Sequence, residues 1–287
     1  MKTISVAHSP DADDIFMYYA IKFGWVRAKD AKFDNIAADI ETLNQATLKG
    51  EYDICAISFA LYPFVKDDYA LLRTAVSFGE GYGPKLIKKI GTKLKRNFKV
   101  ALSGEFTTNA LLFKIAYPEA RISYMNFLEI EEAVLNGTVD AGVLIHESIL
   151  NYNKKLEVEK EMWDIWVELS GGGLPLPLGG MCLRRSIPLH SAIDYENTLI
   201  KAVEIANKNR HVLAPMLIEK GLIRVNAATL DKYLDLYAND NSVKMSDIQY
   251  EALDKLYELG YKNGFYENLI KSKEFLIPSE YEELRAR

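Results

Sequence analysis

Four short polar segments hold the side chains of this sequence that are best suited to chemistry, and each follows an apolar run. The segments are His8-Ser9-Pro10-Asp11, Ser58, Ser103 to Asn109, and His146. Imidazole ionises near neutral pH, so a histidine beside a substrate can accept a proton and return it. His146 is the best single candidate for such a base, and His8 competes with it from a similar position. A purely structural histidine is the alternative in both cases.

The segment that ends at Asn109 has the composition of an anion-binding helix start. Free N–H groups and the helix dipole favour a carboxylate or a phosphate at the beginning of a helix. The hydroxyl groups of Thr107 and Thr108 would add donors. Thr107 would equally well serve as an ordinary helix cap, and the sequence leaves both interpretations open.

Two other kinds of site are not expected. Asp11, Asp13 and Asp14 are explained as caps of the following helix or as solvated carboxylates, so we expect no metal. The segment Gly-Glu-Gly-Tyr-Gly-Pro at 79–84 lacks the following helix that a dinucleotide fingerprint requires. The sequence therefore predicts neither a metal centre nor a nucleotide cofactor.

A weak internal repeat predicts how two of the polar groups are positioned. Residues 46–58 and 133–145 share Ala, Leu, Gly and Asp at four corresponding positions. Each copy resembles the end of a helix, a glycine that ends it, and an apolar strand. Ser58 follows the first strand and His146 the second, so the repeat predicts two lobes that face one cleft. Chance similarity between two helix–strand units is the alternative.

Strands and helices alternate along most of the sequence, which predicts an α/β fold with a mostly parallel sheet in each lobe. Pro175 and Pro177 lie in a glycine-rich segment that a buried central strand would not tolerate. We therefore expect a connection between the lobes there, then a strand over 181–184 and a mainly helical remainder. The predicted first lobe comprises residues 1–95 and 175–287, and the second lobe residues 96–174.

The composition indicates an ordinary globular protein with a small-molecule partner. The 287 residues carry a formal net charge of −5, whereas nucleic-acid binders present a basic face. Cys55 and Cys182 lie in apolar runs and are expected to be buried thiols. No run of 18 apolar residues predicts a membrane span, and the N-terminus does not resemble an export signal, so we expect a cytoplasmic protein.

From His8 to Ala20 the sequence resembles the 1,4-dihydroxy-6-naphthoate synthases, or cyclic dehypoxanthinylfutalosine lyases, of the futalosine route to menaquinone. The resemblance extends in motif order over roughly residues 1–185. Its further segments are residues 39–44, 53–58, 81–84, 107–110, 145–147 and 173–180.

This resemblance implies a two-lobed fold of the type II periplasmic-binding-protein kind, with a ligand cleft between the lobes, used as a cytoplasmic enzyme. It implies that His146 is the base and that other side chains in the cleft bind the substrate. The implied contact residues are Ser9, Asp14, Ser58, Thr107, Thr108 and Asn109. Many members read Ser-Pro-Cys-Pro-Asn-Asp where this sequence reads Ser-Pro-Asp-Ala-Asp-Asp, so that side of the pocket differs.

The implied reaction converts cyclic dehypoxanthinylfutalosine, a carboxylate, into 1,4-dihydroxy-6-naphthoate by breaking a carbon–carbon bond. Aromatisation of the product supplies driving force, so the resemblance implies no cofactor. Two alternatives remain: a non-catalytic cytoplasmic solute-binding protein of the same fold, and the chorismate dehydratase of the same pathway. Nucleic acid and membrane partners are not expected, and the sequence predicts no particular oligomeric state.

Overall fold

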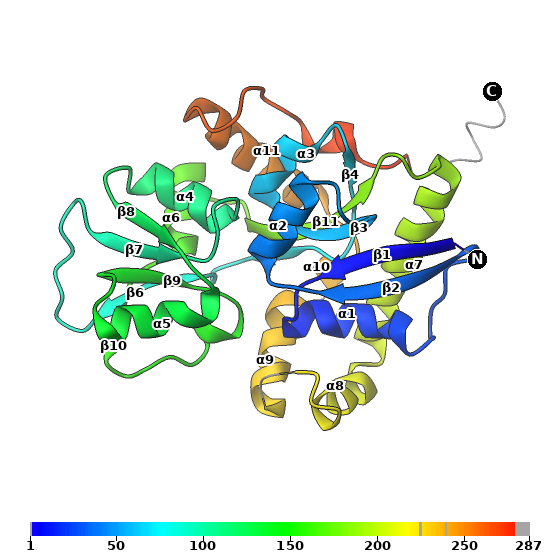
Figure 1. The fold of residues 1–287 in the computed structure, drawn as a ribbon, viewed down its shortest axis with the longest axis horizontal. Helices are drawn as coiled ribbons and strands as arrows, with labels where there is room; N and C mark the ends of the chain where they lie inside the picture. The colour runs from blue at the N-terminus through cyan, green and yellow to red at the C-terminus, as the bar shows by residue number, and fades with distance from the viewer. Residues whose placement is uncertain (1, 224–225, 239, 279–287) are drawn as a thin grey trace.

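Two β-sheets, each in its own lobe, organise the chain (Figure 1). The structure is a computed structural model that describes residues 2–223, 226–238 and 240–278. The lobe that contains the N-terminal strand, lobe 1, is drawn on the right of Figure 1, and lobe 2 on the left. The predicted two-lobed α/β architecture is confirmed.

The sheet of lobe 1 has six strands over the described residues, in the order β2-β1-β3-β11-β4, with β5 also paired to β11. The strands are β1 (Lys2–His8), β2 (Ala31–Ala37), β3 (Ile54–Ser58), β4 (Tyr69–Leu71), β5 (Ser77–Gly79) and β11 (Leu176–Arg184). β1, β2 and β3 run parallel, whereas β11 runs antiparallel to β3, β4 and β5. Every residue of β3 is buried, as expected for a strand covered on both faces.

Helices from both ends of the chain cover this sheet. They are α1 (Ala12–Lys22), α2 (Ile40–Leu48), η1 (Phe59–Leu61), α3 (Tyr62–Val65), α7 (Leu189–Lys208), α8 (Arg210–Glu219), α9 (Ala227–Tyr237), α10 (Asp240–Val243), α11 (Asp247–Lys262) and η3 (Ser272–Phe275). α1 packs against α7 and α9, and α2 packs against β3. The mainly helical C-terminal part was predicted. None of the helices in the described ranges is long and apolar enough to cross a membrane.

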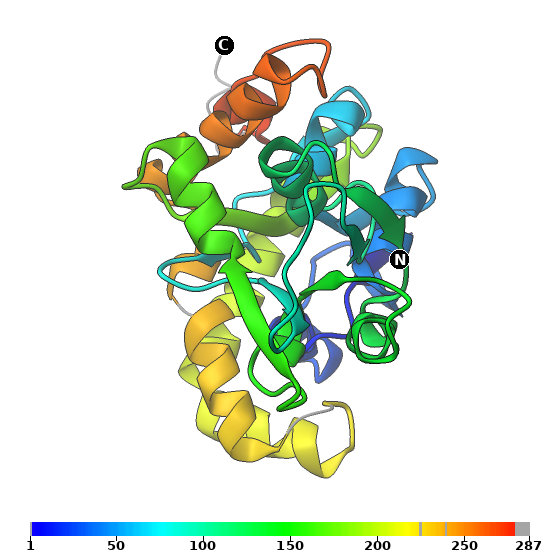
Figure 2. The same ribbon diagram turned by 90° about the vertical axis from the view of Figure 1, so that its left-hand side faces the viewer.

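Lobe 2, which faces the viewer in Figure 2, has a sheet of five strands over the described residues, in the order β10-β6-β9-β7-β8. Its elements are β6 (Lys85–Lys89), β7 (Lys99–Leu102), α4 (Thr108–Ala116), β8 (Arg121–Tyr124), α5 (Phe127–Asn136), β9 (Ala141–Leu144), η2 (His146–Ile149), β10 (Leu156–Glu161) and α6 (Met162–Ser170). β7, β8 and β9 run parallel, whereas β6 is antiparallel to both of its neighbours.

The internal repeat corresponds to equivalent units of the two lobes. α2 leads into β3 and α5 leads into β9, and each of these strands pairs in parallel with the first parallel strand of its own lobe. Gly137 ends α5 with φ +82°, and Gly50 has φ +67° after α2, a conformation that glycine adopts without strain. The repeat therefore places Ser58 and His146 at corresponding sheet edges.

Three expectations about the strands were wrong in detail. The sheets are mixed rather than mostly parallel, because the strands that enter lobe 2 and return from it run antiparallel to their neighbours. β6 belongs to the sheet of lobe 2, so we place the boundary between the lobes near Pro84 rather than at residue 95.

The glycine- and proline-rich segment is also part of a central strand, since β11 begins at Leu176. Pro177 is tolerated there because pairing with β3 begins only at Gly179. On the opposite side, the pairing with β5 shifts register between Pro177 and Gly179. The missing N–H of the proline is thus accommodated at an irregularity.

Candidate functional site

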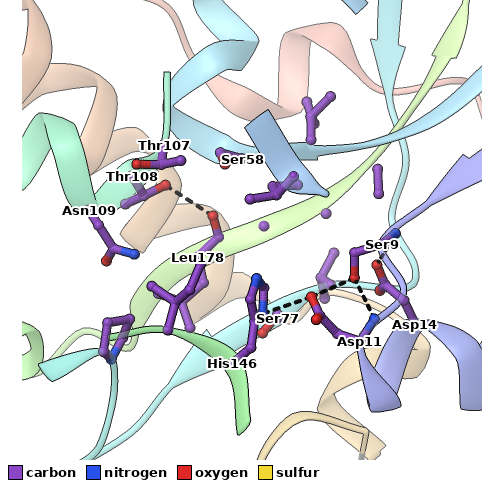
Figure 3. A pocket seen from close by; sticks show the side chains of 18 of the residues that line it. Ser9, Asp11, Asp14, Ser58, Ser77, Thr107, Thr108, Asn109, His146 and Leu178 are labelled. Carbon is purple, nitrogen blue, oxygen red and sulfur yellow. Dashed lines mark hydrogen bonds and ion pairs between the residues drawn. The ribbon is translucent and has the colours of Figure 1, made fainter. Parts of the chain in front are cut away.

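A pocket between the lobes brings together all seven sequence-predicted site residues (Figure 3). It holds about 780 Å³ of empty space, open solvent included, which is in the size range of small-molecule sites. Its polar lining is Ser9, Asp11, Asp14, Ser58 and Ser77 from lobe 1, and Ser103, Thr107, Thr108, Asn109 and His146 from lobe 2. Met17, Ile57 and Leu178 supply apolar walls.

His146 is the second residue after the end of β9, and it lines this pocket. Its backbone has φ +55°, a region that non-glycine residues seldom adopt and that is concentrated at functional sites. The imidazole ring packs edge-on against Phe127, with 5.0 Å between the ring centroids. Nδ1 lies 2.8 Å from Oδ2 of Asp11, across the cleft, and the side chain is 20% exposed.

The loop after β1 supplies a small hydrogen-bond network on the lobe 1 side. Ser9 Oγ donates to Asp11 Oδ2 at 2.6 Å, and the Asp11 N–H donates to Ser9 Oγ at 3.2 Å. The Ser9 N–H donates to Asp14 Oδ2 at 2.9 Å, and burial raises the pKa of the Asp14 carboxyl. Sequence reasoning placed Asp11 in the polar segment after the first strand, but it named only Ser9 and Asp14 as site residues and explained the Asp11 carboxylate as a helix cap or a solvated group.

His8 has a different environment from His146, although both follow strands. Its ring stacks on Tyr18 with 4.9 Å between centroids, and Nδ1 is 2.6 Å from the Ser9 carbonyl oxygen. Nε2 contacts the amide of Asn35. Burial lowers the pKa of His8, which favours the neutral form of the ring. His8 lines a narrow side cavity with Met17 rather than the main pocket.

The start of α4 faces the pocket, but its two threonine hydroxyls bind the main chain. Thr107 Oγ1 accepts from the Ala110 N–H at 3.1 Å and donates to the Gly104 carbonyl at 3.1 Å. Thr108 Oγ1 donates to the Leu178 carbonyl at 3.0 Å. Thr107 is therefore a helix cap, one of the two interpretations that the sequence left open. The groups at this helix start that remain for an anion are main-chain N–H groups.

We expect Thr107→Val to lower the free energy of unfolding by about 1 kcal/mol, the usual cost of losing a helix cap. The change keeps the volume of the side chain and removes the oxygen that accepts from Ala110. Urea denaturation of both proteins measures this difference. Thr107→Ser keeps the capping oxygen and should remain close to the wild type; equal stability of the valine variant would contradict the capping role.

Two further polar side chains of lobe 2 line the pocket with capacity to bind a ligand. Within the described part of the chain, Ser103 Oγ and Asn109 Oδ1 are buried without a hydrogen-bond partner. A buried polar atom in this state costs free energy until a partner satisfies it. Both atoms therefore favour a ligand with polar substituents at this end of the pocket.

Ser58 is held in place from behind by a residue of α2. Asn44 Nδ2 donates to Ser58 Oγ at 3.1 Å, and Asn44 Oδ1 accepts from the Ser58 N–H at 3.0 Å. Since the hydroxyl oxygen accepts from Asn44, the Ser58 O–H can be offered to a ligand in the pocket. Asn44 was not predicted as a site residue; an amide in the middle of a helix is a signal that could have found it.

A close contact joins the lobes beside the pocket. Glu41 of α2 accepts a hydrogen bond from the Phe106 N–H of lobe 2 at 3.3 Å, and burial raises the pKa of the Glu41 carboxyl. Gly104 lies so near that a Cβ atom built on it would be 2.6 Å from the Glu41 Cβ. The lobes can therefore meet this closely only because residue 104 has no side chain.

The described residues contain no group of three His, Cys, Asp or Glu side chains arranged to hold a metal ion. Asp13, one of the three N-terminal carboxylates, has a side chain outside the described set. Cys55 and Cys182 are free, buried thiols opposite each other on β3 and β11, away from the pocket lining.

Comparisons with known proteins agree with this architecture. A family profile described as menaquinone biosynthesis matches residues 4–262. The chain is 31% identical over 258 residues to the 1,4-dihydroxy-6-naphthoate synthase of Streptomyces coelicolor, covering 88% of this chain and 90% of that protein. A crystal structure of an Archaeoglobus fulgidus protein superposes with a TM-score of 0.83 at 32% identity, covering 91% of this chain and 98% of the other.

A more distant structure identifies the fold class. The periplasmic aliphatic sulphonate binding protein of Escherichia coli superposes with a TM-score of 0.64 at 11% identity, covering 96% of this chain and 92% of the other. An identity this low shows a shared fold and nothing more. The predicted fold of the periplasmic-binding-protein kind is confirmed.

Proposed function

This chain belongs to the menaquinone biosynthesis family, and we propose that its cleft carries out the reaction of a 1,4-dihydroxy-6-naphthoate synthase. The chain is a lyase that forms 1,4-dihydroxy-6-naphthoate, as the Streptomyces coelicolor relative is named. The observation that best supports the proposed site is the convergence of all seven predicted residues on one pocket between the lobes. The substrate is cyclic dehypoxanthinylfutalosine.

In the proposed reaction, His146 is the general base. It removes a proton from a carbon beside a carbonyl group, and the electron pair forms an enolate. The carbon–carbon bond to the ribose-derived portion then breaks. The enolate electron pair forms a double bond of the ring system, which becomes aromatic, and the electrons of the broken bond leave with the departing fragment. The imidazolium of His146 returns the proton to the departing fragment, so the histidine ends in its starting state.

The other predicted residues bind and orient the substrate in this proposal. The Ser58 hydroxyl, fixed by Asn44, donates to the enolate oxygen. The N–H groups at the start of α4, together with Asn109, bind the carboxylate of the substrate. Ser9 and Asp14 contact the opposite end, where burial raises the pKa of the Asp14 carboxyl. The apolar walls cover the faces of the ring system.

The decisive experiment incubates the purified protein with cyclic dehypoxanthinylfutalosine and follows 1,4-dihydroxy-6-naphthoate by absorbance or fluorescence. A parallel assay contains chorismate instead. We expect turnover of cyclic dehypoxanthinylfutalosine and no turnover of chorismate. Turnover of chorismate alone would make the protein a chorismate dehydratase. Tight binding without turnover of either compound would make it a solute-binding protein.

We also propose that the enzyme works in the cytoplasm, which fits a biosynthetic enzyme with a small carboxylate substrate. Cell fractionation with an antibody against the chain tests this location. Recovery of the protein outside the cytoplasmic fraction would contradict it.

A further inference from the structure

We propose that Asp11 is a positioning residue for His146 and that closure of the two lobes completes the catalytic base. The inference rests on the proposed function, because it names the group that orients the proposed base. Asp11 belongs to lobe 1 and His146 to lobe 2, so their contact exists only while the lobes face each other at this distance (Figure 3).

Asp11 occupies the N-cap position of a helix, but its carboxylate contacts His146 of the other lobe. It is the residue before the first turn of α1, where an aspartate normally accepts from the N–H groups of its own helix. Among the described interactions of Asp11, none is a side-chain bond that caps its own helix. It points across the cleft, and Oδ2 lies 2.8 Å from Nδ1 of His146. This contact with the other lobe gives the Asp11 carboxylate a partner beyond its own helix.

Burial and hydrogen bonds to Ser9 also fix the orientation of the Asp11 carboxylate. Its residue is 2% exposed, and Ser9 Oγ donates to the same Oδ2 atom at 2.6 Å. The Asp11 N–H closes this arrangement by donating back to Ser9 Oγ at 3.2 Å. A buried carboxylate is stable only when donors satisfy it, and the serine and the histidine are two such donors.

A carboxylate on Nδ1 determines which nitrogen of the ring acts as the base. When Nδ1–H donates to Asp11, the lone pair of the neutral ring is on Nε2, the atom that must accept the substrate proton. The same carboxylate stabilises the imidazolium that forms after the transfer. Asp11 thus fixes the tautomer and the orientation of His146 without touching the substrate carbon.

The backbone of His146 explains why this support matters. Its φ of +55° is unfavourable for a residue with a Cβ and persists only where surrounding contacts hold it. Phe127 supports the ring from within lobe 2, and Asp11 supports it from lobe 1. Separation of the lobes removes the second support, so an open molecule has a histidine whose tautomer and orientation are no longer fixed.

The test compares Asp11→Asn and Asp11→Ala in the full-length protein. The asparagine amide can donate to Nδ1 and so hold the tautomer that carries its proton on Nε2. In that tautomer Nε2 has no lone pair to accept the substrate proton. We expect Asp11→Asn to lower kcat by about 10²–10⁴-fold, at least as much as Asp11→Ala, while KM changes little. A structural role alone predicts the opposite order, because asparagine is the closer match in shape.

A second measurement does not depend on turnover. Nitrogen NMR of the ¹⁵N-histidine-labelled protein, with the His146 signals assigned by comparison with His146→Gln, reports which ring nitrogen carries the proton. We expect protonated Nδ1 in the wild type and protonated Nε2 in Asp11→Asn. Asp67→Asn, which removes an exposed carboxylate of lobe 1 outside the pocket, is the control and should leave both kcat and the spectrum unchanged.

The outcomes separate this inference from the proposed function. An unchanged His146 tautomer in Asp11→Asn, or a kcat close to that of the wild type, would overturn the role of Asp11. A wild-type protein that turns over no cyclic dehypoxanthinylfutalosine, but whose His146 tautomer changes in Asp11→Asn, would overturn the reaction and leave the positioning role standing.

Discussion

Replacing His146 with alanine is expected to lower kcat by about 10²–10⁴-fold, the usual contribution of a general base, while the protein still folds. The ring is partly exposed in the pocket and contacts Phe127 and Asp11, so its removal leaves the cores of the two lobes intact. Steady-state kinetics with cyclic dehypoxanthinylfutalosine measure kcat, and thermal denaturation measures folding. His211→Ala, an exposed change on α8, is the matched control and should behave as the wild type.

A double variant tests whether Asp11 affects the reaction only through His146. If Asp11 acts only through the histidine, the double variant His146→Ala/Asp11→Asn should be no slower than His146→Ala alone. Additive losses would show that Asp11 contributes independently. A kcat of His146→Ala near that of the wild type would remove His146 from the mechanism.

The second large effect is expected from Gly104→Ala, because this change places a methyl group where the lobes meet. Its Cβ would lie 2.6 Å from the Glu41 Cβ, and its three nearest atoms all belong to Glu41 of the other lobe. The lobes must then move apart, and a displacement of about 1 Å in a catalytic group costs about 10²-fold in rate. We expect kcat/KM to fall by about that factor.

Small-angle scattering with saturating product tests the cause of this loss. The wild-type complex should be more compact than the free protein, since closure over a ligand excludes water from the enolate. Gly104→Ala should remain more open. The double variant Gly104→Ala/Glu41→Gly removes the clashing Cβ together with the hydrogen bond from the Phe106 N–H. It should regain compactness and part of the activity, at a cost of about 1 kcal/mol of stability for a glycine in a helix. Compact Gly104→Ala with full activity would contradict this role of the contact.

Sequence reasoning located the pocket because chain topology determines where polar residues that follow strands must lie. Ser58 ends β3 and His146 follows β9, the equivalent strand of the repeated unit, and such strand ends meet at a cleft. The hydroxyls of Thr107 and Thr108 show what a local pattern leaves undetermined. Both hydroxyls donate to main-chain carbonyls, one of them on β11, a strand remote in sequence.

Other features depend on contacts between distant segments and were therefore missed. Asp11 has the local sequence of a helix cap, and only the packing of lobe 1 against lobe 2 turns its carboxylate to His146. Pro177 argued against a strand, but the register shift that accommodates it is a property of the pairing with β5. β6 was assigned to the wrong lobe because a strand gives no local sign of the sheet that it joins.

The path of the chain through lobe 1 has a consequence for synthesis on the ribosome. β3 is complete at Ser58, but its neighbour β11 begins at Leu176, after the whole of lobe 2 has been made. Lobe 2 is continuous in sequence and can fold as a unit while lobe 1 still lacks a central strand. During that interval β3, an entirely apolar edge apart from Ser58, has unsatisfied main-chain groups that can pair with another nascent chain. Shielding this edge until β11 emerges is therefore the step at which molecular chaperones would be most useful to this protein.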